Sequence, residues 1–372
     1  MIGQVAQSAP DYSKKTANKI LDRLNGREIV CWGYNPDFVN SMKQYGIYVM
    51  RTYSSNKTLI EEQGCLPSEQ LKNNSSKLFV LFPNLTSPLN IKKLLKFGYS
   101  EHDYITMYPE RKEIITDGYG HFYDDFGNTV DGYAENFKIE ISGYNNEIRV
   151  GEGVSIPDKM IIRINSPNNK VHIGDKCILK GDYFGDSGVL ISVYGTGSSE
   201  VIIGNSCKLM KCHINTGGYA KVHIGERTTF EPDMMIQADS YTDVNIGKDC
   251  MFSSDVKLQS ADGHSIFDVS TKKNINSSLR AGKDCVRHIK IGDHVWIGRR
   301  CMIIGDTDIG NGSIIGGQSV VKGVFPNNVV AAGTPAKILA KDRAWARKPM
   351  SEDINDCGIY VEETSRELSL TL

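Results

Sequence analysis

A histidine with a carboxylate on either side is the first feature of the chain that could do chemistry. His264 stands in the stretch SADGHSIFD, between Asp262 and Asp268. An imidazole has an ordinary pKa of about 6.5, so its neutral form can accept a proton at neutral pH while a carboxylate orients the other ring nitrogen. The stretch is therefore a candidate for a general base at His264, oriented by Asp262 or Asp268. On the residue types alone, however, a surface histidine is the preferred interpretation of His264.

The segment that contains His264 interrupts a chain that otherwise repeats. A repeated pattern runs through residues 244–258 and resumes at residue 289, so an extended loop at 259–288 leaves the repeats. Loops of this length in compact proteins usually carry a function or are disordered. The repeats on either side of the loop therefore predict the secondary structure that positions it.

The repeats begin near residue 146 and share one unit. Each unit has an aliphatic residue, any residue, Ile or Val, Gly, two further residues and then a small one. The copies are IRVGEGV at 148–154, VHIGDKC at 171–177, VIIGNSC at 201–207, VHIGERT at 222–228, VNIGKDC at 244–250 and IKIGDHV at 289–295. Near the end of the pattern the aliphatic residues recur at every sixth position: Ile291, Ile297, Ile303, Ile309, Ile315 and Val321.

A period of six residues predicts a parallel β-helix. Three hexads make one triangular coil of about 18 residues, and successive coils stack as parallel strands about 4.8 Å apart. The aliphatic residue points inward, and the residue four positions later fills a corner where only a small side chain fits. We expect the Gly after the aliphatic residue to allow the corner turn. A sandwich of short strands would alternate with a period of two, which the hexads do not.

Cysteine usage and charge limit the class of protein. Cys177, Cys207, Cys250 and Cys301 stand at the small-residue position, so we expect core spacers and not nucleophiles. The nine cysteines include no C-x-x-C pair, which favours a reducing compartment over a disulfide framework. The N-terminus lacks an apolar signal and no stretch of about 18 apolar residues occurs, so we expect a cytoplasmic protein. A net charge of -1 gives no argument for nucleic acid.

The first 140 residues follow an α/β pattern. Short apolar runs predict strands at 27–34, 47–54, 77–83 and 102–108, and helical spacing predicts helices at 35–46 and 87–98. Strands that alternate with helices imply a small parallel, Rossmann-like sheet. The turn after the first strand, CWGYNPDF, lacks the G-x-G-x-x-G glycines of a dinucleotide site, so a docking or scaffold domain is preferred.

Two stretches resemble a known family. Residues 294–339, from HVWIG to AKIL, resemble the C-terminal coils of the hexapeptide-repeat acyltransferases. SADGHSIFD resembles the histidine loop of their sugar and polysaccharide O-acetyltransferase branch. The resemblance is strong over 245–345 and looser over 146–245. It implies a left-handed helix, a homotrimer and acetyl-CoA in a cleft between neighbouring subunits. The sequence departs from the family pattern at two places. The branch often has Pro where this chain has Ser265, and Thr334 precedes Pro335. These departures leave the identity of the acceptor undetermined.

The resemblance also implies site residues. His264 would be the base for direct acetyl transfer to a hydroxyl, and Trp296 an oxyanion donor or a wall of the acyl pocket. The phosphates of CoA require cations and backbone N–H groups. Residues expected at the CoA site are Trp296, Arg299, Gly316, Gly317, Lys322, Thr334, Pro335, Lys337 and Arg343. The γ-type carbonic anhydrases share the repeat and hold zinc with three histidines, but their close histidine pair is missing here, so no metal is expected.

These observations give one expected organisation and three possible functions. We expect an α/β domain at 1–140, a left-handed β-helix at 141–340, and a C-terminal helix and tail at 341–372, with AKDRAWARKPM helical and Trp345 inward. The expected function is acetyl transfer from acetyl-CoA to a sugar hydroxyl of a bacterial surface polysaccharide. The alternatives are N-acetylation of a nucleotide-linked amino sugar and a non-catalytic β-helix scaffold. Neither a nucleic acid partner nor a membrane span is expected.

Overall fold

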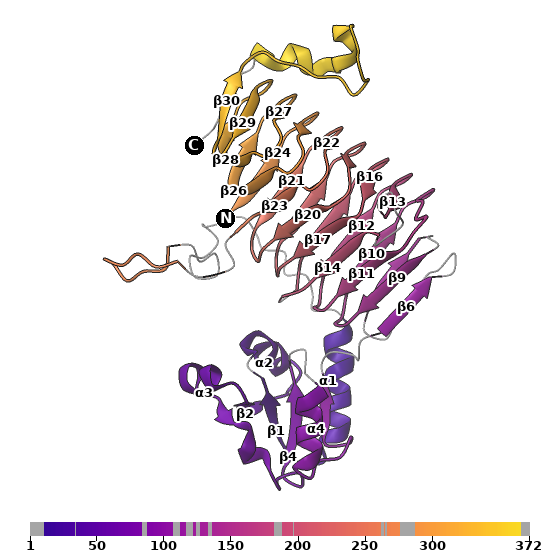
Figure 1. Ribbon diagram of the computed structural model, residues 1–372. Coiled ribbons are helices and arrows are strands. Elements are labelled where there is room, and N and C mark those ends of the chain that lie inside the picture. Colours follow the sequence, from indigo (N-terminus) through magenta and orange to yellow (C-terminus); the bar gives the residue numbers. More distant parts are fainter. Residues whose placement is uncertain are drawn as a thin grey trace. The chain divides into compact units, whose positions relative to one another are not determined.

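The computed structural model describes most of the chain in two compact units, one dominated by residues 1–111 and one by residues 128–372 (Figure 1). The described residues are 11–33, 35–83, 88–106, 112–116, 122–123, 127–132, 136–181, 188–195, 197–261, 264, 266–275 and 287–365.

The first unit is an α/β domain built on a parallel sheet. Its five strands lie in the order β3-β2-β1-β4-β5 and every pairing is parallel. In chain order its elements are α1 (Asp11–Leu24), β1 (Glu28–Trp32), α2 (Pro36–Lys43), β2 (Val49–Ser54), α3 (Lys57–Gln63), β3 (Leu66–Pro67), η1 (Ser68–Leu71), β4 (Leu78–Phe82), α4 (Pro88–Lys96) and β5 (Tyr104–Thr106).

Local sequence explains the central elements of this sheet. The strands β1 and β4 are continuous apolar runs, and the core packs on both of their faces, as parallel strands require. The Asn35 side chain caps α2 by accepting a hydrogen bond from the Phe38 N–H at 2.9 Å, and Pro36 begins the helix. The predicted strands and the two predicted helices are confirmed. The helices α1 and α3 are additional to the prediction.

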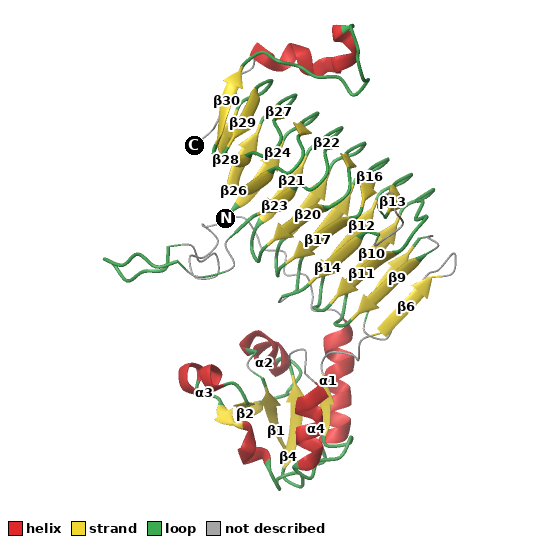
Figure 2. Cartoon of the chain, in the orientation of Figure 1, coloured by secondary structure: helices red, strands yellow, loops and turns green. Residues whose placement is uncertain are grey.

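The second unit is a stack of parallel coils, seen as the long yellow block of strands in Figure 2. Its strands form one sheet of 17 strands and one of eight. They are β6 (Lys112–Thr116), β7 (Phe122–Tyr123), β8 (Thr129–Asp131), β9 (Phe137–Ile141), β10 (Glu147–Val150), β11 (Met160–Ile164), β12 (Lys170–Ile173), β13 (Ile178–Lys180), β14 (Leu190–Val193), β15 (Glu200–Ile203), β16 (Lys208–Met210), β17 (Cys212–Thr216), β18 (Lys221–Ile224), β19 (Thr229–Phe230), β20 (Met234–Ala238), β21 (Asp243–Ile246), β22 (Met251–Phe252), β23 (Lys257–Gln259), β24 (His288–Ile291), β25 (Trp296–Ile297), β26 (Met302–Ile309), β27 (Ile314–Ile315), β28 (Val320–Phe325), β29 (Val330–Gly333) and β30 (Ala336–Ala340).

The register of the strands confirms the repeat and refines its length. Ile291 pairs with Ile309, three hexads further on, as the period of six predicts. In the earlier coils Ile173 pairs with Ile203, and Ile203 with Ile224, so those coils are longer than three hexads. The additional residues lie outside the repeated units. They leave the inward positions in register, so the core continues from coil to coil.

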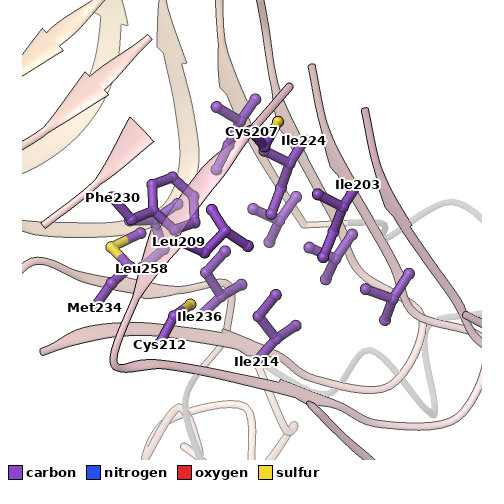
Figure 3. Packing of buried hydrophobic residues seen from close by; sticks show 14 of the residues in the cluster. Ile203, Cys207, Leu209, Cys212, Ile214, Ile224, Phe230, Met234, Ile236 and Leu258 are labelled. Carbon is purple, nitrogen blue, oxygen red and sulfur yellow. The ribbon is translucent and has the colours of Figure 1, made fainter. Parts of the chain in front are cut away.

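The core of the prism consists of the aliphatic columns and the small residues beside them. Figure 3 shows Ile203, Cys207, Ile214 and Ile224 with their side chains directed into the interior. Corner cysteines also bond to the next coil, for example Cys250 Sγ to the Gly292 carbonyl oxygen at 3.1 Å. Burial raises the pKa of the Cys250 thiol to about 12, so it is not a nucleophile at neutral pH. The prediction of core spacers is confirmed.

The prediction for the repeated glycines is wrong in its physical reason. Gly174 does not adopt the left-handed conformation. A Cβ on Gly174 would lie 2.7 Å from the backbone nitrogen of Asn205 in the next coil, so its role is to permit close approach of two backbones. The left-handed turn falls two residues later, on Lys176 with φ 56° and on the equivalent Ser206 with φ 58°.

The C-terminal region also differs from the prediction. The strand β30 pairs antiparallel with β29, and residues 341–350 then run without helix, so the helix predicted for AKDRAWARKPM is wrong. Trp345 is buried, as predicted. The element η3 (Ile354–Ser365), which consists of 3₁₀ turns interrupted by a kink at Gly358, follows in the predicted tail. We call residues 341–361 the C-terminal strap.

Two substitutions in one corner separate the roles of glycine and of the turn residue. Gly204→Ala places a Cβ 2.6 Å from the backbone nitrogen of Glu226, and overpacking of this kind costs about 1–3 kcal/mol. Ser206→Gly relieves a left-handed φ of 58° and should leave the protein unchanged or more stable. Thermal unfolding of both variants measures the difference. Equal unfolding temperatures for the two would contradict this explanation of the repeat.

Candidate active site

The loop that holds His264 leaves the prism at a corner between two strands of the larger sheet. The strand β23 precedes the loop and β24 follows it. At its base the Ser260 hydroxyl accepts a hydrogen bond from the Asp239 N–H at 2.9 Å and lies 2.7 Å from the Thr242 hydroxyl. The loop therefore begins in register with the coil before it. His264 lies four positions after Ser260, and its side chain is exposed.

Beyond His264 the chain forms a hairpin, which leaves the stack of coils in Figure 1. Phe267 and Asn274 form an antiparallel bridge, and the Ile275 N–H donates to the Ile266 carbonyl oxygen at 2.8 Å. These contacts close the hairpin on itself. Phe267 is 55% exposed, so the hairpin carries apolar surface into solvent.

Asp268 holds the turn of this hairpin. Its Oδ1 accepts hydrogen bonds from the Ser270 hydroxyl at 2.6 Å, from the Thr271 N–H at 2.6 Å and from the Thr271 hydroxyl at 2.9 Å. These bonds lower the pKa of the Asp268 carboxyl to about 2, so it is ionised at neutral pH. Its orienting role toward His264 stays a prediction, and Asp262 lies outside the described residues.

Trp296 lies on a different face of the prism from the loop. It belongs to β25 in the eight-stranded sheet, between Met251 and Ile314 of the neighbouring strands, and is 37% exposed. The base of the loop joins β23 to β24, which both belong to the 17-stranded sheet. The fold of one chain therefore presents His264 and Trp296 from two separate sheets.

Several of the residues predicted to bind CoA gather at one end of the eight-stranded sheet. The Gln318 N–H donates to the Arg299 carbonyl oxygen at 2.8 Å, and the Thr334 hydroxyl donates to the Gln318 carbonyl oxygen at 3.3 Å. A Cβ on Gly317 would lie 3.1 Å from the same Arg299 oxygen. Arg299, Gly317 and Thr334 thus come from three successive coils and meet at one corner.

The remaining residues predicted to bind CoA divide into two groups. The Gly316 N–H donates to the Ala331 carbonyl oxygen at 2.8 Å, while the cis bond before Pro335 leads into β30, where Lys337 is exposed. Gly316, Pro335 and Lys337 extend the corner described above. The other group is Lys322, on β28 of the larger sheet, and Arg343, in the C-terminal strap. The structure does not bring these last two together with the others through any contact among the described residues.

A buried histidine that was not predicted as a site residue, His294, holds the C-terminal strap against the coils. His294 is 4% exposed. Its Nδ1 lies 2.7 Å from a carboxylate oxygen of Asp249, and its Nε2 lies 2.9 Å from the Trp345 carbonyl oxygen. A carboxylate and a carbonyl can only accept hydrogen bonds, so the His294 ring is held between two acceptors.

Aromatic rings cover both faces of the His294 ring. The Trp345 ring lies 4.1 Å from the His294 ring and the Tyr360 ring lies 4.7 Å from it, both nearly parallel. Trp345 also donates its indole N–H to the His294 carbonyl oxygen at 2.8 Å, and its ring lies 6.0 Å from that of Trp296. This clamp therefore places the strap beside the exposed indole that was predicted to act in the site.

Part of this clamp could have been found in the sequence. Asp249 and His294 hold the same position in the units VNIGKDC and IKIGDHV, so the aligned repeats place them in adjacent coils. Their strap partners Trp345 and Tyr360 follow no period. Arg347, whose Nε lies 2.6 Å from Asp249, likewise has no signal in the repeats.

The chain is similar in sequence to known O-acetyltransferases. The family described as bacterial transferase hexapeptide (six repeats) matches residues 288–323. The polysialic acid O-acetyltransferase of Escherichia coli O1:K1 / APEC is 36% identical over 144 residues, which are 38% of this chain and 44% of that protein. The putative lipopolysaccharide biosynthesis O-acetyl transferase WbbJ of Escherichia coli strain K12 is 36% identical over 105 residues, which are 27% of this chain and 52% of that protein. The chain thus spans about half the length of these curated relatives.

Solved structures give the fold. The polySia-specific acetyltransferase NeuO superposes with a TM-score of 0.54 at 30% identity, over 62% of this chain and 92% of that one. The polysialic acid O-acetyltransferase OatWY superposes with a TM-score of 0.51 at 24% identity, over 60% of this chain and 97% of that one, which is a likeness of fold. The predicted fold class, with its left-handed parallel β-helix, is confirmed.

In the part of the chain that the structure describes, no helix is long and apolar enough to cross a membrane. Within the same residues, His, Cys, Asp and Glu side chains form no group of three or more that could hold a metal ion.

Asp249→Asn tests the clamp through its pH dependence. Burial alone would raise the pKa of the Asp249 carboxyl, but the hydrogen bonds from His294 and Arg347 outweigh this and lower it. A lowered pKa stabilises the folded state above the unfolded pKa of about 3.9 and ceases to do so as the pH falls through the folded value. Hydrogen exchange of the strap amides should be faster in Asp249→Asn than in the wild type at pH 7, and the difference should shrink below about pH 4.

Asp342→Asn is the matched control, because Asp342 is an exposed carboxylate of the same strap. Its exchange should equal that of the wild type at both pH values. Equal exchange in Asp249→Asn and the wild type at pH 7 would show that the clamp does not hold the strap.

Proposed function

Because the chain belongs to the hexapeptide-repeat acyltransferase family, we propose that it transfers an acetyl group from acetyl-CoA to a hydroxyl of a bacterial surface polysaccharide. The observation that carries the proposal is the interruption of an otherwise continuous prism by a loop with an exposed histidine at its base. The names of the similar proteins, which act on polysialic acid or in lipopolysaccharide biosynthesis, support a capsule or lipopolysaccharide acceptor. Polysialic acid is the first acceptor to try.

The reaction is a direct transfer. The acceptor hydroxyl gives its proton to His264 while its oxygen attacks the thioester carbonyl carbon. The resulting oxyanion accepts a hydrogen bond from the indole N–H of Trp296 or from a backbone N–H. When the intermediate collapses, the carbon–sulfur bond breaks and the CoA thiolate leaves with the proton held by His264. No acyl-enzyme forms, because both substrates are bound together.

Acetyl-CoA is proposed to lie at the corner formed by Arg299, Gly317 and Thr334. Arg299 is exposed there, and Lys337 is exposed on the adjacent β30, so two cations are available to the phosphates. The glycine backbone can approach a ligand closely because it has no side chain. Lys322 and Arg343 remain proposed contacts for the same cofactor from other elements.

The site is proposed to be completed by a second copy of the chain. His264 and Trp296 come from different sheets of one prism, so a homotrimer would let the loop of one copy meet the indole face of its neighbour. The exposed Phe267 and Val269 of the hairpin support this, because exposed apolar surface favours association.

The remaining organisation is also a proposal. The predicted boundary at residue 140 lies inside the second unit, because β6, β7 and β8 precede it there. We propose an α/β domain that ends near residue 111, an acetyltransferase domain that continues to residue 340, and a C-terminal region at 341–372. The α/β domain is proposed to dock the enzyme to its assembly or acceptor. The cytoplasm is the proposed location, in keeping with the eight described cysteines, which are all free and buried.

Calorimetry with acetyl-CoA tests the proposal without knowledge of the acceptor. The wild type and His264→Ala should bind acetyl-CoA with the same affinity, because His264 serves the chemistry and not donor binding. Arg299→Ala should weaken binding at least about tenfold, because a charged hydrogen bond from its guanidinium to a phosphate contributes about 1.5–3 kcal/mol. If a folded wild-type protein binds no acetyl-CoA, the enzyme proposal fails and the scaffold alternative replaces it.

A further inference from the structure

One corner of the prism carries a column of residues in the left-handed conformation. In successive coils the position is occupied by Asn145, Asn168, Ser198, Tyr219 and Tyr241, with φ between 54° and 60°. The Tyr219 N–H donates to the Gly197 carbonyl oxygen at 2.8 Å, and the Tyr241 N–H donates to the Gly218 carbonyl oxygen at 3.0 Å. The five residues therefore share one structural position. We call this set the corner column.

Tyrosine is an unusual choice for this position. A positive φ is tolerated by Gly and Asn but disfavours a bulky side chain. The earlier coils follow that preference with Asn145 and Asn168. Only in the two coils nearest the loop does the column change to tyrosine. Backbone geometry does not explain the change, and strain of this kind often marks a function.

The two tyrosine rings form an exposed stacked pair. Their centroids lie 4.9 Å apart with an angle of 11° between the planes, and the side chains of Tyr219 and Tyr241 are 46% and 39% exposed. Tyr194, itself 37% exposed, accepts a hydrogen bond from the Gln237 amide, which also donates to Asp239, two residues before Tyr241, at 3.2 Å. Aromatic surface and hydrogen-bonding groups thus lie along the same edge.

The column ends at the loop that holds His264. The coil after Tyr241 would continue it, but there the chain leaves the prism, and Ser260 at the loop base bonds to Asp239 and Thr242 on either side of Tyr241. His264 lies only four positions after Ser260, which limits their Cα distance to about 14 Å. The tyrosine pair therefore lies next to the segment that carries the proposed base.

We propose that Tyr219 and Tyr241, with Tyr194, Gln237 and Asp239, form a track that binds the acceptor polysaccharide beside His264. Sugar rings present apolar C–H faces that pack on aromatic rings and hydroxyls that bond to amides and carboxylates. A surface that repeats along successive coils suits a polymer better than a single sugar. The inference rests on the proposed function and selects a polymer acceptor over a nucleotide-linked sugar.

The double variant Tyr219→Asn/Tyr241→Asn tests the track. Asn occupies the same column at two earlier positions, so the unfolding temperature should be unchanged or higher. With polysialic acid as the probe, the affinity for the polymer should fall at least about tenfold and KM should rise in proportion, because aromatic stacking is lost from two rings. Acetyl-CoA affinity should equal that of the wild type.

Ser198→Asn, one coil further from the loop in the same column, is the matched control and should bind the polymer as the wild type does. A double variant that keeps wild-type polymer affinity overturns the track. A lower unfolding temperature or a smaller oligomer would also overturn it, because the tyrosines would then be a stability ladder or a contact between copies. If the wild type binds acetyl-CoA but no polymer, the track fails and the proposed function stands. If the wild type binds the polymer through the tyrosines but binds no acetyl-CoA, the track stands and the proposed acetyl transfer fails.

Discussion

The close approach of backbones in successive coils is the constraint on which the rest of the structure depends. Each coil hydrogen-bonds to the next along its strands, and the glycines after the inward aliphatic residues leave the room this requires. Because the register is continuous, a residue's place in its hexad decides its face or corner. The same rule puts Trp296 on one sheet, the loop base at another corner, and His294 in the coil next to Asp249.

Two segments depart from the repeat: the loop at 259–288 and the C-terminal strap. The chain leaves the register of the coils after β23, and the proposed base His264 follows this point. The strap provides the opposite arrangement, since it returns across the coils and covers His294 with Trp345 and Tyr360. The loop after β23 thus leads away from the coils, whereas the C-terminal strap packs against them beside Trp296.

The sequence predicted the elements that repeat and most elements of the α/β domain, and it failed for the C-terminal strap. Hexad spacing identified the buried columns and the spacer cysteines, because each obeys a local rule. It misassigned the turn to the glycines, since close approach and a positive φ both favour Gly in a sequence, and only the fold shows which applies. The strap could not be predicted because its contacts join residues up to 120 positions apart with no period, such as Arg347 with Arg227 and Trp345 with His294. The assignment of His264 came from resemblance, because a single loop histidine has no spacing to interpret.

A mixing experiment tests most directly the claim that acetyl transfer uses His264 of one copy and Trp296 of another. His264→Ala and Trp296→Leu would be prepared separately and co-expressed, and acetylation of polysialic acid followed by the increase in glycan mass. Each variant alone should lose activity, by about 10²–10⁴-fold in rate for the base and by less for the indole. Equal co-expression should restore about a quarter of wild-type activity, because one site in four then receives both native residues by random assembly. No recovery beside an active wild type would contradict the shared site, and a wild type that transfers no acetyl group would contradict the function itself.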